Sequence, residues 1–266
     1  MSLIIYEIDT FFDTIMNRRN FLRAGSAGVA VILVGCNDPS APGNSQGLAH
    51  LTARPGTPTI VPTPGKKPLG LAIDRDGFIY VPPNYSATRP AALIVLCHGA
   101  GRSSTDWTTA PLDTLFGDRN IVVVAPDSRE VSWDILYGAY GPDVEFIDFA
   151  LSYVFARCVI DPSKIALGGF SDGASYAVSL GLTNGDLFTH VVGFSPGFYV
   201  PDTIRGKPKV FLSHGTSDPV LPFNWTSTQL APGLANGGYS VKFVQFDGGH
   251  QIPLAVATEA MDWFVA

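Results

Sequence analysis

The chain has 266 residues, a formal net charge of −6 and only 15% charged residues. This length is enough for one α/β domain with a sizeable core, and nothing in it demands a second folded domain. The acidic balance, without a basic stripe, excludes a nucleic-acid partner on electrostatic grounds. The five histidines are scattered and lack Cys or carboxylate neighbours at ligand spacing, so we expect no metal site.

The amino terminus has the features of an export signal. Residues 17–23 resemble a twin-arginine motif around Arg18 and Arg19, and the apolar run 24–35 that follows is too short to span a bilayer. The run ends in Leu33-Val34-Gly35-Cys36, which resembles a bacterial lipobox. We expect residues 1–36 to direct export and Cys36 to carry a lipid, giving a membrane-anchored bacterial lipoprotein that faces the periplasm or the cell exterior. A soluble apolar helix is the alternative.

The first 15 residues have the wrong charge for a signal, because they carry Glu7, Asp9 and Asp13 and no basic residue. We hypothesise that translation begins at Met16, so that residues 1–15 are not translated. Amino-terminal sequencing of a precursor with Met1 intact would exclude this hypothesis.

The segment 37–67 is rich in Pro, Gly, Ser and Thr. Such a composition buries too little apolar surface to fold, so it predicts a tether between the membrane and the folded domain.

Strands alternate with helices over residues 68–266, which we predict to be the catalytic domain. An opening hairpin is expected at 69–81. Strands are expected at 93–97, 121–125, 165–168, 190–194, 210–213 and 241–246, and helices from about 107, at 143–157, after 171, near 227–236 and at 253–264. This alternation predicts an α/β fold with a mostly parallel, doubly wound sheet flanked by helices. The loops between 124 and 168 leave no room for an inserted cap domain.

A glycine-rich loop follows the first parallel strand, with the sequence His98-Gly99-Ala100-Gly101. Glycines allow backbone amides to turn toward a substrate oxygen, and Lys-Ser or Lys-Thr, which a phosphate-binding loop requires, does not follow. We expect Gly99 and Gly101 to contact substrate and the Ala100 N–H to donate to an oxyanion, with the Gly101 N–H as the alternative. His98 is expected to brace the loop.

A strand, Gly-x-Ser-x-Gly and a small-residue helix follow one another at residues 164–182, which predicts a nucleophile elbow with Ser171 at its tip. A second Gly-x-Ser-x-Gly surrounds Ser195. In an elbow, the backbone N–H after the nucleophile donates to the oxyanion, and Pro196 has none to offer. We therefore select Ser171 as the nucleophile and Asp172 N–H as the first oxyanion donor, with Ser195 in a nearby loop.

Acid and base are expected after the nucleophile, in the order Asp or Glu and then His. Asp218 and His250 each follow a predicted strand, and the carboxyl ends of parallel strands meet at one edge of the sheet. Asp247 is the alternative acid, although its position three residues before His250 suits it to tying down that loop. His214 is interpreted as structural, with a catalytic role as its alternative.

These motifs together resemble the α/β-hydrolase superfamily, and more narrowly the compact phospholipase/carboxylesterase and dienelactone-hydrolase-like serine esterases, over residues 68–266. The resemblance implies a cofactor-free hydrolase of carboxylic esters or thioesters that acts through an acyl-enzyme. Asp172 departs from the neutral residue that many such esterases carry after the nucleophile, which argues against anionic substrates. A polyester depolymerase, a thioesterase or a small peptidase with the same triad are alternatives, and a non-catalytic binding lipoprotein is another.

Aromatic residues in loops at the carboxyl edge predict an open aromatic cleft for small or polymeric aryl esters. Trp133 and Phe198 are the preferred substrate contacts, and the further candidates are Trp107, Tyr137, Phe223 and Trp225. Ordinary packing is the alternative role for each of them. Membrane contact is expected only through Cys36, and a monomer is expected. Cys97 and Cys158 are predicted to lie at opposite ends of neighbouring strands, so we expect two buried thiols and no disulfide.

Overall fold

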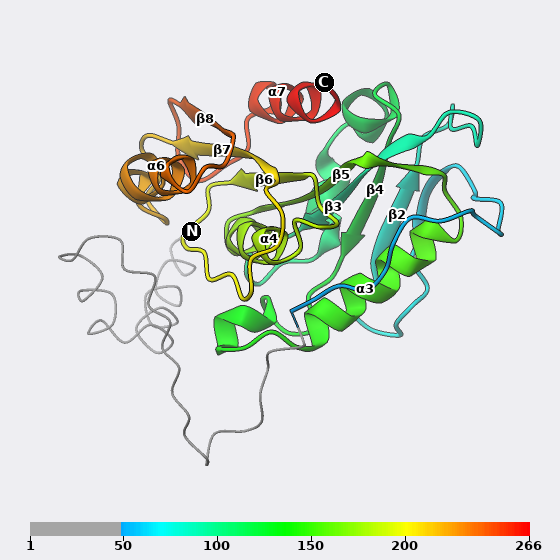
Figure 1. The fold of residues 1–266 in the computed structure, drawn as a ribbon. Helices are drawn as coiled ribbons and strands as arrows, with labels where there is room; N and C mark the ends of the chain where they lie inside the picture. The colour runs from blue at the N-terminus through cyan, green and yellow to red at the C-terminus, as the bar shows by residue number, and fades with distance from the viewer. Residues whose placement is uncertain (1–48) are drawn as a thin grey trace, which may run out of the picture. The chain divides into compact units, whose positions relative to one another are not determined.

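The computed structural model describes residues 49–266, and that part of the chain is built around an eight-stranded sheet (Figure 1). The spatial order is β1-β2-β4-β3-β5-β6-β7-β8. The first two neighbour pairs, β1/β2 and β2/β4, are antiparallel, and every other pair is parallel. This confirms the predicted mostly parallel sheet. The strands are β1 (Gly65–Pro68), β2 (Gly77–Val81), β3 (Ala91–Cys97), β4 (Ile121–Pro126), β5 (Ile160–Phe170), β6 (His190–Phe194), β7 (Lys209–Gly215) and β8 (Val241–Phe246).

Helices cover both faces of the sheet, as a doubly wound topology requires. They are α3 (Pro142–Phe155), α4 (Asp172–Thr183), α5 (Phe223–Trp225), α6 (Ala231–Asn236) and α7 (Leu254–Val265). Strand side chains alternate between the faces: Leu93 and Val95 pack in the core beneath α3 and α4, whereas Ile94 and Leu96 pack in the core beneath α7. Figure 1 shows α7 on the side of the sheet opposite α3 and α4.

Three expected elements differ in the structure. The helix expected from residue 107 is a 3-10 segment, Ser104–Thr109, and a π turn, Asp113–Gly117, because Pro111 between them interrupts a continuous helix. The opening hairpin begins earlier, at Gly65. The helix expected near 227–236 begins at Phe223 and contains a π turn before Pro232, which has no N–H to donate.

The tether prediction is wrong for residues 49–54, which pack on the domain. Leu51 is fully buried, and its N–H donates to Asn184 Oδ1 at 2.8 Å. The N–H groups of Thr52 and Ala53 both donate to Asp148 Oδ1 at 2.8 Å. Buried apolar area and three charge-assisted or amide hydrogen bonds therefore fix a segment that composition alone predicts to be loose.

The predicted signal at 1–36, the lipidation site Cys36 and the tether up to residue 48 lie outside the described residues. Within residues 49–266, no helix is both long and apolar enough to cross a membrane. Cys97 and Cys158 are buried free thiols, as predicted.

Candidate active site

Ser171 lies at a strained turn between β5 and α4. Its backbone has φ 57° and ψ −122°, in a region that residues with a side chain rarely adopt. Its N–H donates to Phe194 O at 2.9 Å, which ties the turn to the end of β6. Such strain persists only where surrounding structure holds it, and it concentrates at functional sites.

Close backbone packing explains the two glycines that flank Ser171. A Cβ on Gly169 would lie 2.3 Å from the carbonyl oxygen of Gly173, and a Cβ on Gly173 would lie 2.3 Å from that of Cys97. Any larger residue at either position would displace backbone. The Gly-x-Ser-x-Gly pattern is therefore the sequence that this tight strand-to-helix crossing requires.

The structure brings Ser171, Asp218 and His250 into one hydrogen-bonded chain. His250 Nε2 lies 2.9 Å from Ser171 Oγ, and His250 Nδ1 lies 2.7 Å from Asp218 Oδ2. The three residues come from the ends of β5, β7 and β8, which are predicted to meet at one sheet edge. Asp247, the alternative acid, is exposed and lies outside this chain of contacts.

Asp218 accepts three hydrogen bonds, and its side chain is fully buried. Its Oδ1 accepts the N–H groups of Val220 at 2.8 Å and Leu221 at 2.9 Å, and its Oδ2 lies 3.1 Å from His214 Nε2 as well as bonding His250. Burial alone would raise the pKa of Asp218. The hydrogen bonds from His250 and the two amides together lower the pKa by more than burial raises it, so the net shift is downward. The carboxylate is therefore ionised and fixed in orientation.

His214, the alternative histidine, is buried away from Ser171. Its Nδ1 lies 2.9 Å from Thr226 Oγ1 and its Nε2 lies 3.0 Å from Leu221 O, besides the contact with Asp218. Burial lowers its pKa and favours the neutral ring. This geometry agrees with the structural interpretation, since His214 helps to hold the loop that carries Asp218.

Ser195, in the second Gly-x-Ser-x-Gly, also has a positive φ of 53°. Its side chain is fully buried, and its Oγ has no hydrogen-bond partner among residues 49–266. Its N–H donates to Ser213 O at 2.8 Å, so it continues the β6–β7 pairing. The structure thus places Ser195 beside the elbow but brings no base to it.

The loop after β3 presents backbone donors near Ser171. Gly99 lies close to Ser171, since a Cβ on it would reach van der Waals distance, 3.5 Å, from Ser171 Cβ. The Gly101 N–H donates to Val131 O at 2.8 Å, whereas the N–H groups of Ala100 and Asp172 have no acceptor within the described part of the chain. The Gly101 N–H is therefore already engaged, and Ala100 and Asp172 stay the predicted oxyanion donors.

His98 braces this loop, as predicted. The Ser128 N–H donates to His98 Nε2 at 3.0 Å, which leaves the proton on Nδ1, and Nδ1 donates to Gly99 O at 2.7 Å. Burial lowers the pKa of His98 and keeps the ring neutral. The His98 ring therefore links the loop at residues 98–101 to Ser128, in the chain after β4.

Asp172 directs its side chain toward the loop before α3. Its Oδ2 accepts a hydrogen bond from Ser132 Oγ at 2.9 Å, and both side chains are buried. Burial raises the pKa of Asp172, while the Ser132 hydrogen bond and the nearby His250 oppose that shift. Sequence reasoning identified Asp172 but missed Ser132, because no local pattern indicates that a loop serine 40 residues earlier reaches it.

The predicted substrate contact at Trp133 is wrong. Its ring is fully buried, stacks on Tyr176 with 4.8 Å between centroids, and donates from Nε1 to His98 O at 2.8 Å. Trp133 therefore supports the loop at residues 98–101 through the carbonyl of His98. Phe198 is half-buried beside α4, where its N–H lies 3.3 Å from Ser175 Oγ. Trp107 is also buried, whereas Tyr137 is exposed.

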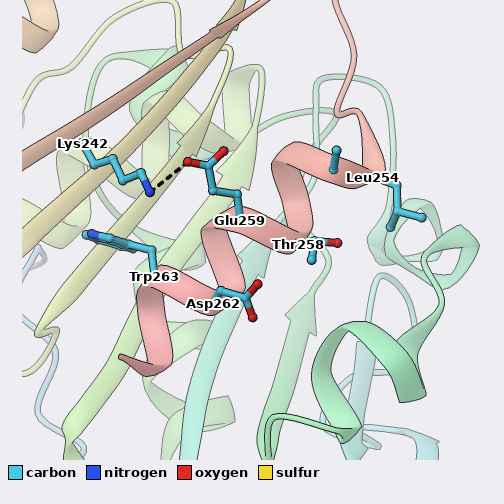
Figure 2. Close-up of a pocket in the computed structure, with 7 residues that line it drawn as sticks. Lys242, Leu254, Thr258, Glu259, Asp262 and Trp263 are labelled. Atoms are coloured by element: carbon cyan, nitrogen blue, oxygen red, sulfur yellow. Dashed lines mark ion pairs between the residues drawn. The ribbon is translucent and has the colours of Figure 1, made fainter.

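A shallow groove of about 640 Å³ lies elsewhere, between β8 and α7 (Figure 2). Figure 2 shows Lys242 and Glu259 facing one another across it, with an ion pair of 2.8 Å. None of Ser171, Asp218 and His250 lines this groove. It is therefore separate from the candidate active site.

Comparisons with known proteins agree with this architecture. Residues 144–262 match the family model described as phospholipase/carboxylesterase. The chain is 28% identical over 216 residues to a probable feruloyl esterase C of Aspergillus flavus, covering 69% of this chain and 79% of that protein. A shorter match is to acyl-protein thioesterase 1 of Emericella nidulans, at 34% identity over 86 residues. It covers 28% of this chain and 36% of that protein.

A solved structure supports the fold. Esterase 2 of Thermogutta terrifontis superposes with a TM-score of 0.58 at 19% identity, covering 80% of this chain and 95% of that one. The sheet order, the elbow and these matches agree: the chain has the α/β-hydrolase fold and is similar to phospholipase/carboxylesterase-type esterases.

Proposed function

We propose that this carboxylic-ester hydrolase is a serine esterase in which Ser171 is the nucleophile, His250 the general base and Asp218 the residue that orients the base. The observation that carries the proposal is the continuous chain of contacts, 2.9 Å from Ser171 Oγ to His250 Nε2 and 2.7 Å from His250 Nδ1 to Asp218 Oδ2. Both distances are within the range in which a proton can be transferred directly.

Acylation begins when Ser171 Oγ attacks the ester carbonyl carbon and His250 Nε2 accepts its proton. Asp218 accepts the Nδ1–H of His250, which leaves Nε2 free to act as the base and stabilises the imidazolium that forms. His250 then protonates the alcohol leaving group. Water attacks the acyl-enzyme by the same route and restores the serine.

The negative charge on the carbonyl oxygen is stabilised by the N–H groups of Ala100 and Asp172. Asp172 begins α4, so its N–H lies at the positive end of that helix dipole. Removing one such donor from a serine hydrolase costs roughly 10²–10³ in kcat.

The substrate class that we propose is a small or aryl carboxylic ester, free or as part of a polymer. The similarity to a probable feruloyl esterase C supports this choice, and the shorter similarity to an acyl-protein thioesterase favours thioesters as the second candidate. The same attacking group serves both, since each reaction passes through an acylated serine.

The signal and lipidation that the sequence predicts remain part of the proposal. We propose that residues 1–36 direct export and that Cys36 carries the lipid. Globomycin-sensitive processing and metabolic labelling with a palmitate analogue would test this, with Cys36→Ala as the control.

A p-nitrophenyl ester series from acetate to palmitate tests the enzyme proposal on the full chain. Short-chain turnover that Ser171→Ala abolishes and Ser195→Ala retains is the expected result. Matched thioesters assayed in parallel measure the second candidate. Turnover that survives Ser171→Ala would overturn the proposed nucleophile.

A further inference from the structure

Three consecutive residues between β4 and α3, residues 131–133, each make one hydrogen bond to a part of the chain that carries a proposed oxyanion donor. The bonds run from Gly101 N–H to Val131 O at 2.8 Å, from Ser132 Oγ to Asp172 Oδ2 at 2.9 Å and from Trp133 Nε1 to His98 O at 2.8 Å. Two of them reach the loop at residues 98–101, and one reaches the start of α4. We call residues 131–133 the bridge, because they join the two parts that supply the Ala100 and Asp172 N–H groups.

The bridge is fixed on both sides by one carboxylate. Asp143, in the first turn of α3, accepts the Arg129 N–H at Oδ1 over 2.5 Å and the Asp134 N–H at Oδ2 over 2.6 Å. The Asp143 side chain is buried, and so is the Trp133 ring within the bridge. The backbone of the bridge, and with it the Ser132 hydroxyl, is therefore held from α3.

The Asp172 carboxylate is a group that the site has to restrain. Asp172 is the first residue of α4, and a carboxylate at this position is attracted to the N–H groups at the start of its own helix. Those groups include the Asp172 N–H, which must stay free for the oxyanion. A carboxylate turned toward them would also repel the negative charge that develops on the substrate oxygen.

In the structure, the Ser132 hydroxyl binds this carboxylate. Within residues 49–266, it is the one hydrogen-bond donor to the Asp172 side chain, and the Asp172 N–H has no acceptor. Both side chains are buried, so neither can exchange this bond freely for one to bulk water. An acidic side chain thus lies next to the nucleophile without occupying the oxyanion donor.

We propose that Ser132 is a positioning residue, which holds the Asp172 carboxylate off the N–H groups at the start of α4 and so keeps the oxyanion site open. The inference rests on the proposed function, and it adds a residue from the chain between β4 and α3 to the same site. Ser132 acts on charge that develops only in the transition state. Its loss should therefore lower kcat and leave KM nearly unchanged.

Ser132→Ala tests this role through hydrolysis of p-nitrophenyl acetate by the full chain at pH 8. Loss of an oxyanion donor costs roughly 10²–10³ in kcat, so partial competition for one should cost about tenfold, with KM within about twofold of native. Ser132→Thr keeps the hydroxyl and should keep most of the native kcat.

The double variant Ser132→Ala, Asp172→Ala separates this role from a purely structural one. It keeps the N–H of residue 172 but removes the carboxylate, so its kcat should be at least about threefold higher than that of Ser132→Ala alone. A contact that served only to anchor the bridge would give no such recovery, because its second partner would be lost as well.

Ser179→Ala is the matched control. Ser179 is a buried serine about two turns along α4 from Ser171, and its Oγ donates to Ser175 O at 2.7 Å and accepts the Val200 N–H at 2.8 Å. The substitution removes a buried, hydrogen-bonded hydroxyl far from the carboxylate, so kcat should stay within about twofold of native. Thermal unfolding checks every variant, and Ser132→Cys, with its weaker S–H donor, takes the place of Ser132→Ala if that variant does not fold.

A folded Ser132→Ala, or Ser132→Cys in its place, with kcat within about twofold of native would overturn the inference. A loss of kcat that Asp172→Ala does not reverse would overturn it as well. Failure of the proposed function would look different, since the native chain would then hydrolyse no p-nitrophenyl ester or Ser171→Ala would retain turnover.

Discussion

Replacing Asp218 by asparagine would change one carboxylate oxygen to an NH₂ group. It would also move the ring proton of His250 from Nδ1 to Nε2. The carboxylate accepts two backbone N–H groups at Oδ1 and the His250 Nδ1–H at Oδ2. An amide has only one acceptor oxygen, so its NH₂ must face either the two backbone donors or His250. The backbone donors cannot change, whereas the His250 ring can take the other tautomer, so we expect the amide nitrogen to face His250.

This orientation forces the wrong tautomer on His250. With the side-chain NH₂ of the new asparagine as donor, His250 Nδ1 must accept, which places the ring proton on Nε2, opposite Ser171 Oγ. A base that already carries a proton cannot take the serine proton. The equivalent substitution in a Ser-His-Asp triad of another fold lowers kcat about 10⁴-fold with the geometry intact, and we expect a loss of that order. At about 1.4 kcal/mol per tenfold, this is roughly 5.5 kcal/mol of transition-state stabilisation.

Steady-state hydrolysis of p-nitrophenyl acetate at pH 8 measures the loss, and thermal unfolding checks that the variant is folded. Asp247→Asn is the matched control, since Asp247 is exposed and lies only three residues before His250. Its kcat should stay within about twofold of native. A folded Asp218→Asn variant that kept more than about a tenth of the native kcat, or equal effects of the two substitutions, would exclude this role for Asp218.

Three further predictions concern charge and stability. Asp172→Asn should lower the preference of the enzyme for butyrate esters over succinate half-esters, because it removes a carboxylate one residue from Ser171 that would repel an anionic acyl group; an unchanged preference would show that the Asp172 side chain, which bonds Ser132, does not act on the acyl group. The pKa of Asp143 is raised to about 7, by burial first and then by Asp134, so the folded state holds this proton more tightly than the unfolded chain does, and the free energy of unfolding should fall as pH rises from about 4 to 7. Urea unfolding at several pH values should show this slope flattened in Asp143→Asn, and a steeper slope would contradict the assignment. Leu51→Ala should destabilise the domain by about 2–5 kcal/mol in the same assay, whereas a residue in a loose tether would cost close to nothing.

The chain of contacts among Ser171, His250 and Asp218 could be predicted because its constraints are local or topological. Gly169 and Gly173 are required by backbone contacts at the elbow, and the ends of parallel strands bring Asp218 and His250 to the edge where Ser171 lies. Pro196 distinguished the two serines, although Ser195 shares the positive φ of Ser171. Each of these signals is carried by residues adjacent in sequence to the site.

The errors concern contacts between distant residues. Trp133 was predicted at an open cleft because it lies in a loop at the correct edge, but its ring is covered by Tyr176, far along the chain, and no periodicity in a loop indicates which way a side chain points. Leu51 was placed in a tether because its neighbours are polar and small. Its N–H bonds Asn184, 133 residues later, and the N–H of the next residue, Thr52, bonds Asp148, 96 residues later, so composition could not reveal these contacts.

Covalent labelling with a fluorophosphonate, followed by peptide mapping of the full chain, tests the central claim most directly. The phosphorus atom reacts with an activated serine, so its position identifies the nucleophile independently of the natural ester. We expect one label per chain, on Ser171, lost in Ser171→Ala and retained in Ser195→Ala. A label on Ser195, or no label on a folded chain that hydrolyses esters, would contradict it.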